Sequence, residues 1–339
     1  MKKQYTQIAL FTIATIFLFA CQSGSKEDSK QKDRPIPVET QKDYLAKTMP
    51  PQQFGLQIYR VGQNGIAYTG RVHLHPNHFS TAKMLEDDIP LIKMTGRASR
   101  EKFHALIDPS SPISWMEFST SRKVRAHFLG IDDLVIPYRG SYNTGGVDAY
   151  AAVVDQVHIE TLFMECLPLY IRMSIGSLGP LARGIIKPQV DAIIGYDNLQ
   201  AFEYIQFNFP NRSLTFSSDT PYKPKKSPRL FSAKILSAKN YGLVVKGTIN
   251  DEPAPIILDL CANYHFARGD LRVTSTPAVG LGDLELLDLP TLLLPRNNAP
   301  ARIGRKELSN YLVTVCPKLG VVYFEKISAE FPAPETKKP

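Results

Sequence analysis

The feature that most constrains the fold of this chain is a pattern that occurs twice. The segments "TGRASREKFHALIDPSS" and "KGTINDEPAPIILDLCA" each contain a polar tip, an apolar run and then an aspartate. Gly96 stands twelve residues before Asp108, and Gly247 stands twelve residues before Asp259. A polar tip followed by an apolar run is typical of a β-hairpin. The repeat therefore predicts two related β units in one chain.

The repeat continues downstream of each aspartate. The segment "AIIGYDNLQAF" places Leu199 four residues after Gly195, and "ARIGRKELSNY" places Leu308 four residues after Gly304. Short β runs close each copy, and a Pro- and Lys-rich stretch, "SSDTPYKPKKSPR", separates them. An aspartate in an Asp-Pro-Ser turn is by itself ordinary turn chemistry. The duplication is what makes Asp108 a candidate functional residue.

The order of these segments resembles that of the two-lobed aspartic peptidases, the retropepsin and pepsin families. In that family each lobe contributes one Asp on an Asp-Thr/Ser-Gly-Ala/Ser loop, and an apolar-apolar-Gly segment packs beside the loop. The resemblance covers roughly residues 90–327, and it implies a mainly β fold of two related lobes. The loop positions are held by Asp108, Pro109, Ser110 and Ser111 in the first copy, and by Asp259, Leu260, Cys261 and Ala262 in the second.

The resemblance implies a peptide or protein ligand in a cleft between the lobes, with Asp108 and Asp259 as the catalytic residues. Two carboxyl groups within hydrogen-bonding reach cannot both ionise, so they share one proton. The ionised group takes a proton from a water molecule, while the protonated one polarises the scissile carbonyl. No cofactor and no metal are expected.

The loops nevertheless depart from the family pattern. Pro109 and Leu260 have no hydroxyl group where the family has Thr or Ser, so the usual hydrogen bonds between the two loops are lost. Ser110 and Cys261 carry a Cβ where the family has Gly, which costs about 1–2 kcal/mol if the backbone is left-handed there. Because small errors in such a site lower rates severely, two interpretations stay open: an active divergent peptidase, or an inactive peptide-binding or scaffold protein.

The two copies differ in length. Asp108 lies 87 residues before Gly195, whereas Asp259 lies only 45 residues before Gly304. By the resemblance, the longer copy has room for a flap over the cleft within "VIPYRGSYNTGGVDAYAAV", with Tyr138 or Tyr142 as a flap aromatic residue. A clipped hairpin near "VGLGDLEL" is expected in the shorter copy.

The first residues have the pattern of an export signal. Two lysines precede an apolar run from Ile8 to Phe19 that is too short to span a bilayer, and "LFAC" follows. This box resembles that of bacterial lipoproteins, in which the Cys is lipidated, although Phe19 is bulkier than usual. We therefore expect a signal peptide over 1–20 and a lipid anchor at Cys21. Because Gln22 follows the Cys, the resemblance implies the outer membrane of the cell envelope. An uncleaved membrane anchor is the alternative.

Composition sets the remaining expected boundaries. The polar, Pro-containing segment 21–53 is predicted to be a flexible tether, because it has too little apolar surface to fold alone. We expect an N-terminal β lobe over 54–218, a linker over 219–240, a C-terminal β lobe over 241–329 and a tail over 330–339. The formal net charge is +8, but the basic residues are scattered, so no nucleic-acid partner is expected.

Other constellations are weaker. His73, His75 and His78 lack a clear fourth metal ligand, and edge-strand histidines are the simpler interpretation. A Cys261–His265 nucleophile pair lacks an orienting third residue. Free thiols are favoured over a Cys261–Cys316 disulfide, because three cysteines besides Cys21 leave one unpaired. A structural lipoprotein with an unrelated β-sandwich would require the repeat to be accidental.

Overall fold

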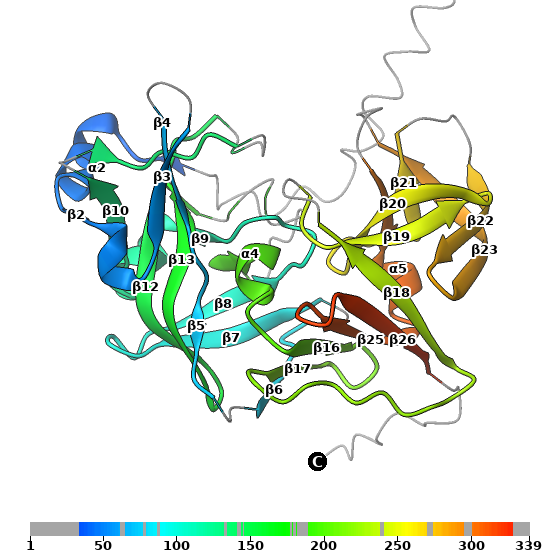
Figure 1. The fold of residues 1–339 in the computed structure, drawn as a ribbon. Coiled ribbons are helices and arrows are strands. Elements are labelled where there is room, and N and C mark those ends of the chain that lie inside the picture. The colour runs from blue at the N-terminus through cyan, green and yellow to red at the C-terminus, as the bar shows by residue number, and fades with distance from the viewer. Residues whose placement is uncertain are drawn as a thin grey trace, which may run out of the picture. The chain divides into compact units, whose positions relative to one another are not determined.

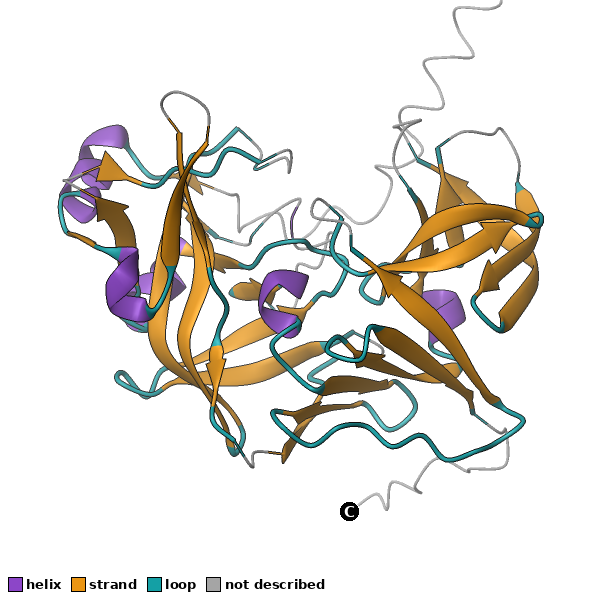
Figure 2. Ribbon diagram, viewed as in Figure 1, coloured by secondary structure: helices purple, strands orange, loops and turns teal. Residues whose placement is uncertain are grey.

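The computed structural model describes residues 34–61, 65–76, 79–86, 89–131, 134–140, 144, 146–176, 178, 181, 189–237, 241–269, 274–294 and 300–327. The predicted lipidation site Cys21, with the whole signal segment, lies outside this range, as do Tyr142 and His78. The described chain is mainly β, with only short helices (Figure 2). None of the helices described is long and apolar enough to cross a membrane.

Two closed six-stranded barrels form the lobes (Figure 1). The strands of the first barrel are β7 (Leu91–Gly96), β8 (Lys102–Ile107), β9 (Trp115–Glu117), β12 (Ala149–Ile159), β13 (Leu162–Arg172) and β15 (Ala192–Ile194). Those of the second barrel are β19 (Val244–Ile249), β20 (Glu252–Asp259), β21 (Phe266–Arg268), β22 (Ser275–Leu281), β23 (Leu284–Leu293) and β24 (Ala301–Gly304). The prediction of a mainly β fold with two β lobes is confirmed.

The two barrels share one connectivity. In the first, the pairing runs β7-β8-β15-β9-β13-β12 and closes back to β7, and in the second it runs β19-β20-β24-β21-β23-β22 and closes back to β19. The register also corresponds, because Ile107 pairs with Ile194 in parallel in one barrel and Leu258 pairs with Ile303 in the other. Each pair stands one residue before the repeated Asp and Gly. The repeat in the sequence is therefore a structural repeat and is not accidental.

The hairpins that precede the aspartates form where the sequence predicts them. In the second barrel the turn consists of Asn250 and Asp251, with φ of 50° and 66°. Asn and Asp tolerate this left-handed backbone, which two-residue hairpins require. Pro253 and Pro255 are accommodated in β20 because its second neighbour, β24, joins only from Ile256 onward.

A third sheet joins the lobes. It consists of β6 (Phe79–Lys83), β17 (Ser213–Ser217), β16 (Tyr204–Asn208), β25 (Tyr311–Cys316), β26 (Val321–Lys326) and β18 (Leu230–Leu236), in that spatial order. Its two central strands come from different lobes and pair antiparallel, with Gln206 opposite Thr314. The Gln206 side chain also donates a 3.0 Å hydrogen bond to the Thr314 hydroxyl.

The remaining elements lie around the first barrel or directly follow the repeated glycines, Gly195 and Gly304. They are β1 (Arg34–Pro35), α2 (Val38–Leu45), β2 (Thr48–Met49), the 3-10 helix η1 (Pro51–Phe54), β3 (Gln57–Val61), β4 (Gly65–Thr69), β5 (His73–Leu74), α3 (Phe118–Lys123), β10 (His127–Ile131), β11 (Leu134–Val135), β14 (Ser174–Ile175), α4 (Tyr196–Leu199) and α5 (Arg305–Leu308). The strands between residues 57 and 83 do not all extend the first barrel: β3 and β4 form their own hairpin, and β6 belongs to the joining sheet.

Two expected boundaries are wrong. Residues 34–53 are not a tether, because β1 pairs with β14, β2 pairs with β10, and Ile36 is buried. The few apolar residues of this segment pack against the first lobe. The composition of the segment alone could not predict this packing. The linker 219–240 likewise contains β18, which pairs with β19 on one side and β26 on the other. The strand was not predicted because it follows directly after the Pro- and Lys-rich run.

Candidate active site

The first aspartate stands where β8 ends. Asp108 is 1% exposed, and its backbone N–H donates to the Ile194 carbonyl at 3.0 Å. The loop then turns tightly, with the Ser111 N–H bonded to the Asp108 carbonyl. Ser110 donates to Asp108 Oδ1 twice, from its backbone N–H at 3.0 Å and from its hydroxyl at 2.7 Å. The carboxylate is thus held by its own loop.

The second aspartate is the last residue of β20 and is fully buried. Its carboxylate is held differently. The Tyr264 hydroxyl donates to Asp259 Oδ2 at 2.8 Å, and Arg302 Nη1 lies 3.5 Å from the same oxygen. Arg302 belongs to β24, two residues before the repeated Gly304. A guanidinium group and a phenol are partners that suit an anionic carboxylate.

The two loops touch, although the hydroxyl groups that the family uses for this purpose are absent. The Cys261 thiol donates to the carbonyl of Ile107, the residue before Asp108, at 3.5 Å. The Leu243 N–H donates to the Pro109 carbonyl at 2.7 Å. A Cβ at Gly242, whose φ is +69°, would lie 2.4 Å from that same carbonyl. Glycine is therefore required where the second lobe meets the first loop.

The predicted backbone cost at the third loop position does not arise. Neither Ser110 nor Cys261 is among the described non-glycine residues with positive φ. The two residues replace glycine without left-handed backbone. Leu260, in place of Thr or Ser, is fully buried in the main hydrophobic core, so the position has become a packing position.

Matching contacts support the two loops from behind. A Cβ at Gly195 would lie 2.4 Å from the Ile113 carbonyl, and one at Gly304 would lie 2.1 Å from the Tyr264 carbonyl. Each of those carbonyls belongs to the residue five positions after its aspartate. The residues one position further on also correspond. Ser114 accepts a 2.8 Å hydrogen bond from the Asn198 side chain, and His265 Nδ1 lies 3.0 Å from Glu307 Oε2.

Among the flap candidates, Tyr138 lies in the segment between β10 and β12, which the structure describes in part. Its ring contacts Trp115 edge-on at 4.8 Å and Tyr170 at 5.1 Å between centroids. Trp115 stands seven residues after Asp108. The hairpin predicted near "VGLGDLEL" is present, because β22 and β23 pair antiparallel around Gly282 and Asp283, and these strands correspond to β12 and β13 of the first barrel.

The weaker constellations separate in the structure. Cys166, Cys261 and Cys316 form no disulfide with one another, as predicted. The Cys261 thiol bonds to Ile107 and the His265 ring to Glu307, which leaves the two side chains with different partners. His75 pairs with Glu165 at 3.1 Å. The described residues contain no group of three His, Cys, Asp or Glu side chains suited to a metal ion.

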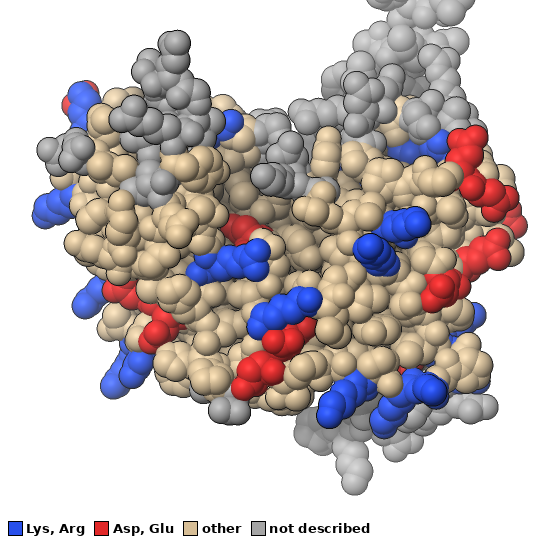
Figure 3. Space-filling model, in the orientation of Figure 1, with Lys and Arg blue, Asp and Glu red and all other residues tan. Residues whose placement is uncertain are grey.

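The face of the molecule in Figure 3 shows basic and acidic side chains dispersed rather than gathered in one patch.

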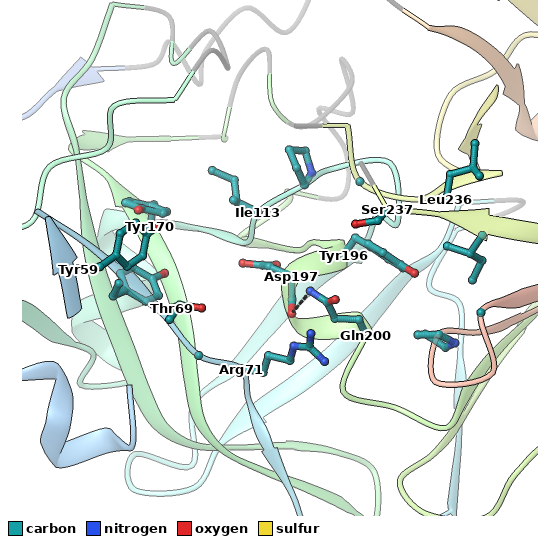
Figure 4. Close-up of a pocket in the computed structure, with 17 residues that line it drawn as sticks. Tyr59, Thr69, Arg71, Ile113, Tyr170, Tyr196, Asp197, Gln200, Leu236 and Ser237 are labelled. Carbon is teal, nitrogen blue, oxygen red and sulfur yellow. Dashed lines mark hydrogen bonds between the residues drawn. The ribbon is translucent and has the colours of Figure 1, made fainter. Parts of the chain in front are cut away.

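A cavity of about 920 Å³ lies between the lobes, and neither Asp108 nor Asp259 lines it. Side chains from both lobes line the cavity (Figure 4): Tyr59, Tyr68, Thr69, Arg71, Pro112, Ile113, Tyr170, Tyr196, Asp197 and Gln200 from the first, and Ile235, Leu236, Ser237 and Pro317 from the second, with Gly70, Gly242 and Gly320.

Asp197 is the acidic residue among the described residues that line this cavity. Burial raises the pKa of its carboxyl group from the usual 3.8 to about 6, although hydrogen bonds from Ser114 and Asn198 act in the opposite direction. Burial likewise raises the pKa of Tyr170, and the Asp197 charge adds to the effect. The carboxylate and the phenol ring are therefore within electrostatic reach of each other.

Three functional candidates escaped the sequence analysis. Arg302 and Tyr264 both contact Asp259. In the sequence, Arg302 is marked only as a charged residue inside an apolar segment, and Tyr264 only as an aromatic residue shortly after Asp259. Asp197 stands in the repeated Gly-x-x-x-Leu segment, where it looked like the first turn of a short helix.

Comparisons with known proteins do not assign a family. No family model matches the chain, and no curated protein matches it. A solved structure with a similar arrangement is the crystal structure of basic 7S globulin from soybean, at 10% sequence identity and a TM-score of 0.48, over 75% of this chain and 96% of that one.

Proposed function

We propose that the chain is an aspartic-peptidase-like hydrolase in which Asp108 and Asp259 act together on a peptide bond. The observation that supports this proposal is that both aspartates occupy one position of a repeated barrel, directly after the strand that pairs in parallel with the repeated Gly segment. The contact of Cys261 with the Ile107 carbonyl lays the two loops against each other. A position shared by two lobes is what a two-carboxylate site requires.

The contacts of each carboxylate suggest separate roles. Asp259 faces Arg302 and Tyr264, which suit the anionic form, so we assign it as the base that takes a proton from water. Asp108 then carries the shared proton and polarises the peptide carbonyl. Water adds to the carbonyl carbon, and the amine leaves after it gains a proton from the pair. Because both carboxylates are almost fully buried here, the site must open before a peptide can enter.

Peptide cleavage by the full chain tests this proposal. A peptide library is incubated between pH 3 and pH 7 with wild type, Asp108→Asn and Asp259→Asn, and Asp43→Asn serves as the matched control because that exposed aspartate lies outside the loops. We expect each loop variant to lose at least about a hundredfold in rate, as loss of acid–base catalysis does, and the control to keep full activity. Cleavage that survives in both loop variants would refute the proposal.

One observation favours a second function. Arg302 and Tyr264 occupy Asp259 Oδ2, an oxygen that an active pair needs for water, and a peptide-binding protein has no such need. This alternative predicts that the wild type cleaves nothing, but binds peptides from the same library with an affinity that the Asp108→Asn change leaves unaltered.

We also propose that the protein is anchored to the cell envelope by a lipid on Cys21. The support is the sequence "LFAC" after a short apolar run. Metabolic labelling with a palmitate analogue in a bacterial host should mark the wild type, while Cys21→Ser should remain unlabelled and Cys166→Ser should be labelled normally. Label on the Cys21→Ser variant would contradict the proposal.

A further inference from the structure

The cavity between the lobes has the features of a second binding site, and neither Asp108 nor Asp259 lines it. Its volume of about 920 Å³ is in the range that holds small molecules or a side chain with its flanking backbone. Four tyrosines and one carboxylate line it, together with apolar residues such as Ile113 and Leu236 (Figure 4). Such a lining gives an apolar wall and a single point of negative charge.

The Asp197 carboxylate is held in place by the protein but is not neutralised by it. Oδ1 accepts hydrogen bonds from the Ser114 hydroxyl at 2.7 Å and the Asn198 N–H at 2.9 Å. Oδ2 accepts one from the Ser114 N–H at 3.1 Å. A carboxylate oxygen has room for two donors, so Oδ2 can take one more. No Lys, Arg or His within the described part of the chain forms an ion pair with Asp197.

Arg71 is the one basic residue among the described residues that line the cavity, and it is directed elsewhere. Arg71 influences the pKa of Tyr196, which burial raises to about 12 and the Arg71 charge lowers in part. Figure 4 draws the Arg71 guanidinium beside Gln200, whereas the Asp197 carboxylate is on the side of the tyrosines. The Asp197 carboxylate therefore lies on the side of the aromatic rings, and no basic residue in the described ranges is its counter-ion.

Tyrosine rings lie on one side of this carboxylate, where Figure 4 labels Tyr59 and Tyr170. Tyr68 and Tyr170 stand 5.8 Å apart between ring centroids, tilted by 36°. Burial and the Tyr170 and Asp197 charges raise the pKa of Tyr68, so both rings remain neutral at ordinary pH. Tyr59 lines the same wall and is half exposed. Neutral aromatic rings beside a carboxylate attract cations through the negative faces of the rings.

We propose that this cavity binds a primary alkylammonium group, such as a lysine side chain, with the ammonium donating a hydrogen bond to Asp197 Oδ2 and its alkyl chain packed against Tyr59, Tyr68 and Tyr170. Neither Asp108 nor Asp259 lines the cavity, so this proposal does not depend on whether the pair is catalytic. Because protonated Asp197 offers no charge, binding should weaken as the pH falls through about 6.

The test uses Nα-acetyl-lysine methylamide as the probe and the norleucine analogue, which has the same chain length without the charge, as its control. Binding to the full chain is measured by calorimetry or ligand NMR. We expect the lysine probe to bind at least tenfold more tightly than the norleucine probe at pH 7.5, and to weaken about tenfold at pH 5, where roughly a tenth of Asp197 is ionised if its pKa is about 6. Equal affinity for the two probes, or no pH dependence, would overturn the proposal.

Variants of the cavity residues test which side chains bind the lysine probe. Asp197→Asn should weaken lysine binding at least tenfold, whereas Asp43→Asn, which removes an exposed charge away from the cavity, should change nothing. Tyr59→Leu should weaken binding several-fold and Tyr59→Phe should not, because only the ring face is needed. If Asp197→Asn proves unfolded, the two probes and the pH series on wild type still decide. Unchanged binding in a folded Asp197→Asn would show that the carboxylate only holds the Ser114 loop.

Discussion

The two barrels have the same connectivity but hold their aspartates by different means. In the first lobe, Asp108 is held by Ser110 of its own loop. In the second, Asp259 is held by Tyr264, farther along the connection between β20 and β21, and by Arg302 of β24. The backbone supports correspond residue for residue, whereas the groups that touch the carboxylates do not. The repeat therefore preserves the placement of the acids and leaves their electrostatic surroundings free to diverge.

Substitution of the glycines that pack behind the two aspartate loops should have the largest effect on stability. Gly304→Ala places a Cβ about 2.1 Å from the Tyr264 carbonyl, and Gly195→Ala places one 2.4 Å from that of Ile113. We expect each change to lower the free energy of unfolding by about 3 kcal/mol or more, since backbone cannot move aside cheaply.

Denaturant unfolding measures both glycine variants against Gly320→Ala. That position has φ of 68° but open space around it, so only a backbone cost of about 1 kcal/mol applies. Similar losses at all three positions would show that the close contacts do not matter.

Asp197 should make the free energy of unfolding depend on pH. The second lobe has no corresponding carboxyl group, because Lys306 stands at the equivalent position. The folded pKa of about 6 lies above the usual 3.8, so the folded state holds the proton more tightly. Stability from this group is complete below pH 4, is lost as the pH rises to about 6, and changes by about 2–3 kcal/mol in total.

The measurement for Asp197 is the free energy of unfolding from pH 4 to pH 7 for wild type and Asp197→Asn. The difference between the two should change between pH 4 and pH 6 and level off as the pH approaches 7. A difference that is constant throughout would mean that the folded pKa of Asp197 is ordinary.

Arg302→Ile makes the second lobe resemble the first, where Ile193 holds the corresponding position. Loss of the guanidinium leaves a buried Asp259 with fewer partners, so we expect the free energy of unfolding at pH 7 to fall by about 1–2 kcal/mol. A double-mutant cycle with Asp259→Asn isolates the pair. Additive effects of the two changes would show that Arg302 does not interact with Asp259.

The smallest effect should come from the thiol between the loops. Cys261→Ala removes the donor to the Ile107 carbonyl and should cost about 0.5–1 kcal/mol, while Cys261→Ser keeps a donor and should cost less. Thermal unfolding of both variants under reducing conditions compares them. Greater stability of the Ala variant than of the Ser variant would argue against a hydrogen bond from this sulfur.

The sequence allowed the two related β lobes to be predicted because backbone requirements leave strong local signals. The spacing of Gly96 from Asp108 and of Gly247 from Asp259 reflects hairpin length, and the later glycines reflect close approach of backbone. Arg302 and Tyr264 could not be assigned, because their contacts with Asp259 depend on the register of β24 and on a loop conformation. The docking of residues 34–53 depends on a surface that the segment itself does not contain.

The pairing of β16 with β25 has a consequence for how the molecule can be divided. A fragment that ends after β17 would keep the first barrel but leave β16 as a bare edge strand, with unpaired backbone groups along one side. Two such fragments could pair edge to edge through β16, in the way that β16 now pairs with β25. Expressed alone, the first half of this protein should therefore tend to form a dimer through this edge.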